Sequence, residues 1–348
     1  MDFSLFYFSA DSTESKCNRY ELLLEGARFA DINGFCAVWT PERHFHQFGG
    51  LYPNPAVTGS AVAAVTTNIG IRAGSVVAPT HQPARIAEEW SVVDNLSNGR
   101  VGVSFASGWS ALDFTFTPEN YARRHELLFE YTDQVRRLWR GEDLEIVDGA
   151  GDPTRVRIFP PPVQPELPVW ITSGGNIETF RSAGRAGAGL LTHLLGQEMD
   201  DLSHKIEEYR AEYRKATGGG RGHVALMVHT FLGDQENEIK EMVRGPLTEY
   251  LRSSINLLVG SRSVDAQKID PSALRQSDID FLVQRSFDRY FEESGLLGGL
   301  EKGRGVVERL SGIGVDELAC LIDFGLPTAD VLNGLKYLNQ LRESCVSV

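Results

Sequence analysis

The stretch Gly34-Phe35-Cys36-Ala37-Val38-Trp39-Thr40-Pro41-Glu42-Arg43-His44-Phe45-His46 joins an apolar run directly to a charged run with two histidines. Its first part, residues 34–38, has the pattern of a buried strand, because it is short and almost continuously apolar. The second part, residues 39–46, then lies at the C-terminal end of that strand. In α/β barrels the chemistry takes place at the C-terminal ends of the strands, so the stretch favours a barrel and indicates where its site lies. Taken alone, the charged run is equally compatible with a solvated loop.

Strand-like and helix-like segments alternate along almost the whole chain. The strand-like segments are 3–8, 35–39, 69–78, 101–106, 168–172, 188–194, 223–232 and 318–322. The helix-like segments are 18–32, 56–66, 83–97, 119–140, 176–187, 198–216 and 328–342. A doubly wound open sheet would need a glycine-rich turn after its first strand, and residues 6–11 contain no glycine. We therefore predict an α/β fold, a TIM-like (β/α)₈ barrel.

Two segments interrupt this alternation. Residues 141–167 are rich in Gly, Asp and Pro, which predicts an excursion that contains a small hairpin. Residues 234–312 have the pattern of a long, mostly helical insertion before the last strand. We expect residues 1–348 to form a single barrel domain that carries these two additions.

The composition argues against several kinds of partner and compartment. The formal net charge of −13 argues against nucleic acid and anionic membrane surfaces, because both favour clusters of Lys and Arg. No apolar run approaches the roughly 20 residues that span a bilayer, and we identify no signal peptide. The four cysteines, Cys17, Cys36, Cys320 and Cys345, are scattered along the chain. This scatter predicts a reduced, cytoplasmic protein without disulfides.

Ser173-Gly174-Gly175-Asn176 is the clearest ligand-binding motif. It follows a predicted strand and precedes a predicted helix, so its backbone N–H groups and the helix N-terminus can bind an anion such as phosphate. The alternative is an ordinary tight turn in which Asn176 caps the helix. Arg124 and His125, at the start of the helix 119–140, are the nearest candidate cations, and the alternative for them is a solvated helix face.

His44 is the candidate proton-transfer residue, because the unperturbed pKa of histidine, about 6.5, suits proton transfer near neutral pH. His44 and His46 could instead bind a metal together with Glu42. Arg43 places a cation between the two histidines, and no nearby carboxylate is evident that would orient them. We therefore expect no metal site.

Three further histidines occur in other predicted segments. His193 and His229 lie at predicted strand ends, where they either line the pocket or are buried structural residues. His81 precedes Pro83 at the start of a predicted helix, so we expect it to belong to a loop.

Taken together, these motifs resemble the bacterial luciferase-like, flavin-dependent monooxygenases. The resemblance is closest to the mupirocin-type branch, which is associated with polyketide and nonribosomal peptide assembly lines. The motifs occur in order at residues 39–46, 98–103, 106–109, 138–142, 168–176, 191–197, 229–231 and 316–325. The resemblance implies a TIM-like barrel with a long insertion before the last strand, in agreement with the segment pattern.

The resemblance also implies a cofactor and the residues that bind it. The cofactor would be FMN in its reduced form, FMNH₂, supplied by a separate flavin reductase, and O₂ would form a flavin C4a-(hydro)peroxide. Gly74 and Ser75 would form a non-prolyl cis peptide under the flavin ring. The phosphate would lie against Ser173, Gly174, Gly175 and Asn176. The lining of the flavin and its ribityl chain would be Ser107, Gly108, Thr192 and His193, with Arg124 or His125 supplying positive charge near the phosphate.

The resemblance finally implies an activity. His44 would handle a proton, and Arg43 or His229 would position the substrate; the light-emitting members have two adjacent histidines where this chain has Arg43-His44. The substrate would be a biosynthetic intermediate, such as an acyl or aminoacyl group on a carrier protein, and we expect a homodimer. Two alternatives stay open: a deazaflavin (F420)-dependent oxidoreductase on the same barrel, and a flavin-binding protein without catalysis.

Overall fold

Parallel strands close into a barrel within residues 1–8, 18–47, 49–260 and 276–346, the part of the chain that the computed structural model describes. In spatial order the eight barrel strands of this part are β1 (Asp2–Phe6), β2 (Ala37–Thr40), β3 (Gly70–Val77), β4 (Val101–Ala106), β7 (Val169–Thr172), β8 (Gly189–His193), β9 (Val224–Leu232) and β11 (Glu317–Leu321). The barrel closes because β11 pairs in parallel with both β9 and β1. The predicted (β/α)₈ barrel is confirmed.

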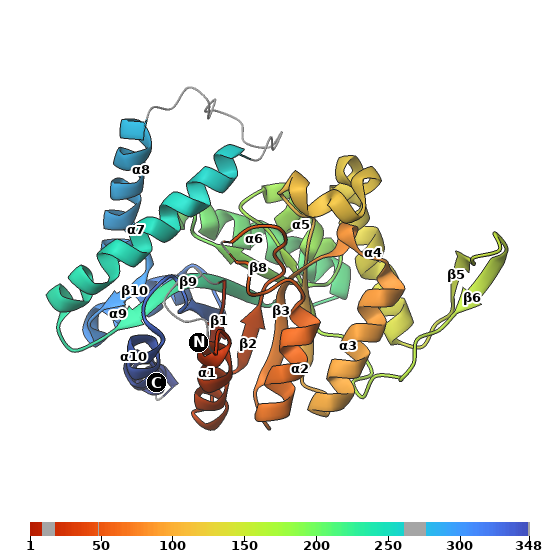
Figure 1. Cartoon of the computed structure of the whole chain (residues 1–348), viewed down its shortest axis with the longest axis horizontal. Helices are drawn as coiled ribbons and strands as arrows, with labels where there is room; N and C mark the ends of the chain where they lie inside the picture. The colour runs from red at the N-terminus through yellow and green to blue at the C-terminus, as the bar shows by residue number, and fades with distance from the viewer. Residues whose placement is uncertain (9–17, 48, 261–275, 347–348) are drawn as a thin grey trace.

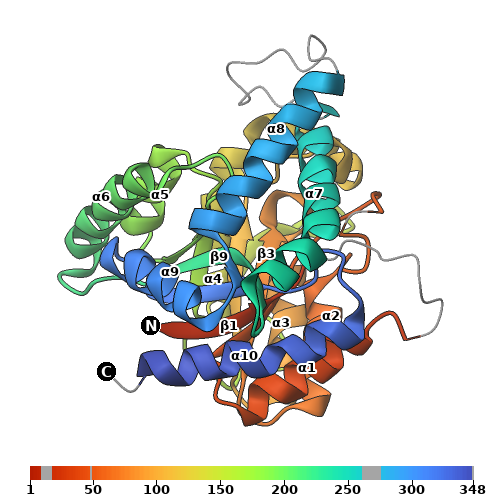
Figure 2. The same cartoon turned by 90° about the vertical axis from the view of Figure 1, so that its left-hand side faces the viewer.

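Helices surround the barrel, and α10 lies alongside α1 (Figures 1 and 2). These outer helices are α1 (Glu21–Ile32), α2 (Pro55–Val65), α3 (Pro83–Ser97), α4 (Arg124–Trp139), α5 (Ile177–Arg185), α6 (Met199–Thr217), α9 (Leu300–Gly312) and α10 (Thr328–Val346). Local sequence fixes where several of them begin. The Asn54 side chain accepts hydrogen bonds from the N–H groups of Ala56 and Val57, and Pro55 takes the first helical position of α2.

The first turns of the predicted helix 119–140 are not α-helical. Two 3₁₀ segments, η2 (Ala111–Phe116) and η3 (Pro118–Arg123), precede α4, and the α-helix begins only at Arg124. Pro118 is responsible in part, because it lacks an N–H and fixes its own φ at the start of η3. These segments follow β4 and contribute side chains to the C-terminal end of the barrel.

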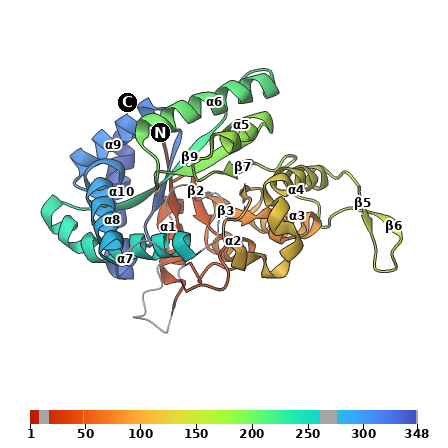
Figure 3. The same ribbon diagram turned by 90° about the horizontal axis from the view of Figure 1, so that it is seen from above.

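Residues 141–167 leave the barrel and contain a two-stranded ribbon. In it, β5 (Leu144–Val147) pairs antiparallel with β6 (Pro153–Val156). The ribbon extends away from the rest of the molecule, as Figures 1 and 3 show. Its outer residues Ile146 and Val147 are exposed, so the ribbon contributes little to the core.

The insertion that follows β9 packs against that strand. Its described elements are the paired helices α7 (Glu236–Gly260) and α8 (Gln276–Arg289), the π-turn η5 (Tyr290–Ser294) and the short strand β10 (Leu296–Gly298). Residues 261–275 of the predicted insertion, like Cys17, lie outside the described residues. β10 extends the sheet by pairing with Thr230–Leu232, a pairing that three residues are too few to predict.

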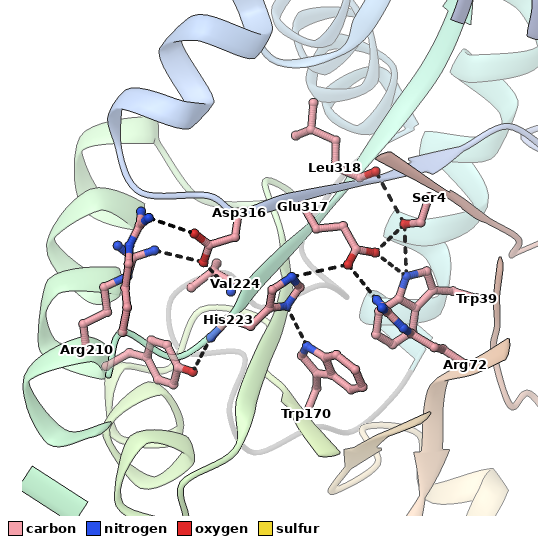
Figure 4. A network of polar contacts seen from close by, with 12 residues as sticks. Ser4, Trp39, Arg72, Trp170, Arg210, His223, Val224, Asp316, Glu317 and Leu318 are labelled. Atoms are coloured by element: carbon pink, nitrogen blue, oxygen red, sulfur yellow. Dashed lines mark hydrogen bonds and ion pairs between the residues drawn. The ribbon is translucent and has the colours of Figure 1, made fainter. Parts of the chain in front are cut away.

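A buried polar network fills the N-terminal end of the barrel interior (Figure 4). The Glu317 carboxylate, which is fully buried, pairs with the Arg72 guanidinium at 2.6 Å and accepts hydrogen bonds from Ser4 Oγ at 2.5 Å and Trp39 Nε1 at 2.8 Å. The guanidinium lies between the indole rings of Trp39 and Trp170, 4.9 and 4.6 Å from their centroids. These paired groups fill the barrel interior at its N-terminal end.

Strand register places His193 and His229 inside the opposite, C-terminal end of the barrel. Alternate residues of a strand share a face, so Leu321 faces the interior as Glu317 does. His229 pairs with Leu321, and His193 pairs with Met227, two residues before His229. Both histidines therefore face the barrel interior at its C-terminal end. None of the described helices combines the length and the apolar character that a membrane span requires.

Candidate active site

A chain of hydroxyl groups joins three strands at the C-terminal end of the barrel. The Gly74–Ser75 peptide in β3 is cis, as predicted. Ser75 Oγ is hydrogen-bonded to Thr172 Oγ1 of β7, which also lies 2.6 Å from Ser104 Oγ of β4. A Cβ atom on Gly74 would lie 2.7 Å from the Phe6 ring, so this position requires glycine. The sequence marked Gly74 and Ser75, and the roles of Ser104 and Thr172 emerge only from the register.

The Ser173–Asn176 turn confirms the capping interpretation of its sequence, and its anion-binding interpretation stays a prediction. Asn176 caps α5, since its side-chain oxygen accepts a hydrogen bond from the Glu178 N–H at 2.8 Å. The Gly175 N–H points to Ser173 Oγ at 3.3 Å. Gly175 has φ +120°, and a Cβ atom there would lie 2.9 Å from Gln197 Cδ. The turn, called the cradle below, thus lies at a helix N-terminus, and its Gly175 packs against the Gln197 side chain so closely that a Cβ atom has no room.

Two residues outside the predicted site support this turn through hydrogen bonds. Gln197 Nε2 donates hydrogen bonds to the His193 carbonyl at 2.6 Å and to Thr192 Oγ1 at 3.3 Å. The buried Lys205 Nζ donates to Gln197 Oε1 at 2.9 Å. Thr192 Oγ1 in turn donates to the Ser173 carbonyl at 2.8 Å. Lys205 gives no local signal in the sequence, because it lies within an ordinary amphipathic helix pattern.

His193 presents a neutral N–H group toward the cradle. Its Nδ1 atom accepts a hydrogen bond from the Leu195 N–H at 3.1 Å, so the ring proton resides on Nε2. Burial lowers the pKa of His193 to about 4, which keeps the ring neutral at pH 7. Nε2 lies 3.5 Å from the position that a Cβ atom on Gly174 would occupy. Backbone and imidazole N–H donors at a helix N-terminus fit a phosphate group.

Arg124 packs against the loop that follows β4. Its side chain is buried, and Nε donates to the Gly108 carbonyl at 3.2 Å while the guanidinium covers the Tyr121 ring. Gly108 has φ +77°, and a Cβ atom there would lie 2.8 Å from Phe114 and Val77. Arg124 therefore fixes the loop that contains Ser107 and Gly108. His125, the next residue, is exposed on α4.

Glu42 connects two histidines that are far apart in the sequence. Its Oε1 atom lies 2.7 Å from His44 Nε2 and 2.6 Å from His81 Nε2, and its Oε2 atom accepts the Val77 N–H at 2.8 Å. Burial alone would raise the pKa of Glu42, but the hydrogen bonds from both histidines outweigh it and lower the pKa. Glu42 is therefore an ionised, fully buried carboxylate. Within the described part of the chain, no three His, Cys, Asp or Glu side chains form a metal-binding group.

Arg43 faces away from Glu42 and toward η2. Its side chain is 4% exposed, pairs with Asp113 at 3.4 Å and stacks on the Trp109 ring at 4.5 Å. Burial lowers the pKa of Arg43 and raises that of Asp113, although each opposes the other's shift. The Arg43–Asp113 pair therefore joins the loop that carries His44 to η2.

Exposed aromatic side chains surround His44. The Phe116 ring meets the His44 ring edge-on at 5.2 Å, and Phe45 lies 5.7 Å from it. Phe45 and Phe116 are 55% and 59% exposed, although large apolar side chains are usually buried. Phe45 also adopts a left-handed backbone with φ +56°, which is unfavourable for a bulky residue.

His229 of β9 lies in an aromatic box built by the insertion and the segment after β11. Its ring contacts Tyr250, Tyr290 and Phe324 edge-on, with centroids 4.7 to 5.7 Å apart. Burial lowers the pKa of His229 to about 3, and its Nε2 atom has no hydrogen-bond partner among the described residues. A buried polar atom without a partner is unusual and often marks a ligand-binding position.

Comparisons with known proteins identify related flavin-dependent and F420-dependent enzymes. The chain is 25% identical over 243 residues to the oxygenase component of the flavin-dependent trigonelline monooxygenase of Acinetobacter baylyi, covering 68% of this chain and 67% of that protein. It is 32% identical over 199 residues to the F420-dependent glucose-6-phosphate dehydrogenase of Amycolatopsis mediterranei, covering 53% and 58%.

A solved structure shows the same fold over almost the full length. The oxygenating constituent of 3,6-diketocamphane monooxygenase from Pseudomonas putida, in complex with FMN, superposes with a TM-score of 0.74 at 18% identity, covering 98% of this chain and 97% of that one. The family model for luciferase-like monooxygenases matches residues 1–287. With this match over most of the chain, the protein is a member of the luciferase-like monooxygenase family.

Proposed function

We propose that the protein is the oxygenase of a two-component system, which takes reduced FMN from a separate flavin reductase and uses O₂ to oxygenate an organic substrate. Family membership supports an enzyme of this kind, and the related trigonelline monooxygenase is itself described as an oxygenase component. The observation that carries the proposal is the convergence of the Ser173–Asn176 cradle, the cis Gly74–Ser75 peptide and the Glu42–His44 pair on one end of the barrel.

In this proposal the cradle holds the FMN phosphate. The Gly174 backbone N–H and the Nε2–H group of His193 donate hydrogen bonds to it, and the N-terminus of α5 adds partial positive charge. The neutral donors suit an acidic protein, since they bind an anion without a basic patch. Ser107, Gly108 and Thr192 line the rest of the cofactor, and Arg124 fixes the Ser107–Gly108 loop. Bound reduced FMN supplies the electrons that activate O₂.

The remaining residues act on the substrate side. Residues Gly74 and Ser75 give the cofactor ring a flat backbone surface, and His44 moves a proton at the substrate. Phe45 and Phe116 shield His44 from water when an apolar substrate covers them. His229 Nε2, which has no hydrogen-bond partner in the described part of the chain, binds a polar substrate group. Arg43 positions the substrate indirectly, by holding the His44 loop against Asp113.

We further propose a biosynthetic substrate and place the protein in the mupirocin-type branch. An acyl or aminoacyl group on a carrier protein is the first substrate to test, because that branch is associated with assembly lines. In this proposal residues 1–348 form one domain, and the protein acts as a homodimer.

The deciding experiment combines the purified protein with a flavin reductase, NADH, FMN and ¹⁸O₂, and measures product mass. One ¹⁸O atom in the product of a carrier-bound substrate supports the proposal, and fragmentation of the product distinguishes insertion at carbon, nitrogen or a C–C bond. Complete conversion of O₂ to hydrogen peroxide with every carrier-bound and free candidate would contradict it.

The second candidate function is an F420-dependent hydride transfer. It is favoured by the 32% identity to an F420-dependent dehydrogenase, whose aligned segment covers 53% of this chain. Reduction of F420 by a candidate alcohol or sugar phosphate, followed at the absorbance of oxidised F420, tests it. F420 turnover together with no FMN-dependent oxygenation would replace the first proposal with the second.

A further inference from the structure

We propose that Glu42 is a positioning residue that holds His44 and His81 as Nε2–H tautomers, so that Nδ1 of His44 is the atom that accepts and returns the proton. This inference rests on the proposed function for the role of His44, but its structural part does not. Neither the family resemblance nor the sequence pattern assigned His81 to the site.

The tautomers follow from the acceptors around Glu42. An ionised carboxylate only accepts hydrogen bonds, so each imidazole nitrogen facing it must carry a proton. Nε2 of His44 and Nε2 of His81 both face Oε1, at 2.7 and 2.6 Å. The other oxygen, Oε2, accepts the Val77 backbone N–H at 2.8 Å. The carboxylate is therefore surrounded by three donors and cannot turn to release either histidine.

The consequence is a defined proton-transfer atom. With Nε2–H held by Glu42, only Nδ1 of neutral His44 has a free lone pair, and the carboxylate stabilises the imidazolium that forms when Nδ1 takes a proton. The proton returns from Nδ1, and the Nε2–H bond to Glu42 persists throughout. His81 engages the second lone pair of Oε1, which keeps the carboxylate from rotating away from His44.

Other charged groups around this cluster act on it more weakly. Asp113 of η2 lies close enough to interact electrostatically with His44 and Glu42, and it is paired with the neighbouring Arg43. On α3, Glu89 raises and Arg85 lowers the pKa of His81, and these two side chains pair with each other. Glu42 is the group that both histidines contact directly.

Glu42→Gln gives a specific expectation. The Val77 backbone N–H can only donate a hydrogen bond, so the carboxamide oxygen must face it. The carboxamide NH₂ group then faces the two histidines. Each imidazole must now present an unprotonated Nε2, which switches it to the Nδ1–H tautomer. Nδ1 of His44 then no longer accepts a proton, and product per reduced FMN should fall about 100-fold or more.

The test reads the tautomers directly, in protein without cofactor. Long-range ¹H–¹⁵N spectra of ¹⁵N-histidine-labelled wild-type protein should show His44 and His81 as Nε2–H tautomers, assigned with His44→Gln and His81→Gln. In Glu42→Gln both should appear as Nδ1–H. Glu89→Gln is the matched control, because it removes the same charge near His81 without a hydrogen bond to either ring, and it should leave both tautomers unchanged.

The outcomes separate this inference from the proposed function. Nδ1–H tautomers in the wild type, or unchanged tautomers in Glu42→Gln, overturn the inference, and the wild-type spectrum decides even if the variant does not fold. Switched tautomers with wild-type product yield and an unshifted pH profile also overturn the positioning role. Failure of the proposed function appears separately, as wild-type protein with the expected tautomers and no oxygenated product.

Discussion

Glu317→Gln should destabilise the fold while leaving the C-terminal end of the barrel unchanged. The substitution keeps the shape of the side chain and one carbonyl oxygen but removes the charge opposite Arg72. The carboxylate is fully buried and receives hydrogen bonds from Ser4, Trp39 and Arg72. The carboxamide can accept from some of these donors, but its NH₂ group must face at least one of them.

The loss in the free energy of unfolding depends on the groups that remain without a partner after the substitution. Losing one hydrogen bond to a charged group costs about 1.5–3 kcal/mol. Leaving the Arg72 guanidinium without its partner raises the loss to about 3–5 kcal/mol, the usual cost of breaking a buried ion pair. The Arg72 side chain is 17% exposed, so water reaches part of it. We therefore expect a loss near the lower end, about 3 kcal/mol in the free energy of unfolding.

Equilibrium unfolding in urea at pH 7, followed by tryptophan fluorescence, measures this loss. Glu317→Gln and Arg72→Met should each cost about 3 kcal/mol, and a Glu317→Leu/Arg72→Met double variant should cost much less than the sum, because it removes both charges. Glu145→Gln on the exposed strand β5 is the control for a change of charge alone. A Glu317→Gln protein within about 0.5 kcal/mol of wild type, the range of an ordinary surface substitution, would refute the reasoning.

Four further outcomes are expected. Anaerobic titration should show tighter binding of reduced than of oxidised FMN, and equal affinities would contradict a two-component oxygenase. Gly175→Asp should reduce FMNH₂ affinity far more than Gly141→Asp, which shares a positive φ but has nothing within 4 Å of a Cβ atom; equal losses of affinity and melting temperature would favour a purely structural turn. His44→Ala should keep flavin binding, consume O₂ and lose about 10²–10⁴-fold in product as hydrogen peroxide escapes, whereas wild-type yield would make His44 structural. Burial lowers the pKa of His193 to about 4 and of His229 to about 3, so the unfolded chain binds more protons between these values and about 6.5. The free energy of unfolding should therefore rise with pH across this window, and His229→Gln should make the slope shallower when urea midpoints are compared at each pH.

Local sequence patterns predicted the elements of the fold well. The helix 83–97 and the strand 101–106 have the bounds of α3 and β4, because a proline starts the helix and a left-handed Asn98 ends it. The start of α4 was wrong, since an apolar spacing of three and four does not distinguish a 3₁₀ turn from the first turn of an α-helix. The strand β10 was missed because three residues carry no periodicity.

The site was predictable only where its residues follow the strands. Ser173 and His193 lie at strand ends, so the barrel pattern alone brings them to one end of the molecule. Glu42 and His81 are joined by a side-chain contact across 39 residues, which no local spacing records. The same holds for Lys205 behind the cradle, whose importance depends on which face of α6 packs inward.

Barrel closure by the first and last strands has a consequence for how the chain is made. The hydrogen bond from Ser4 to Glu317 spans 313 positions, and Arg72 is 245 positions from its partner carboxylate. Until the ribosome has released β11 during synthesis, β1 and β9 each have one unpaired edge. The Arg72 guanidinium also lacks the Glu317 carboxylate until then. Contacts of such long sequence separation slow folding, and they leave unpaired strand edges that can associate with other chains. The nascent protein should therefore depend on chaperones most strongly just before β11 is released, when the other seven barrel strands have already been made.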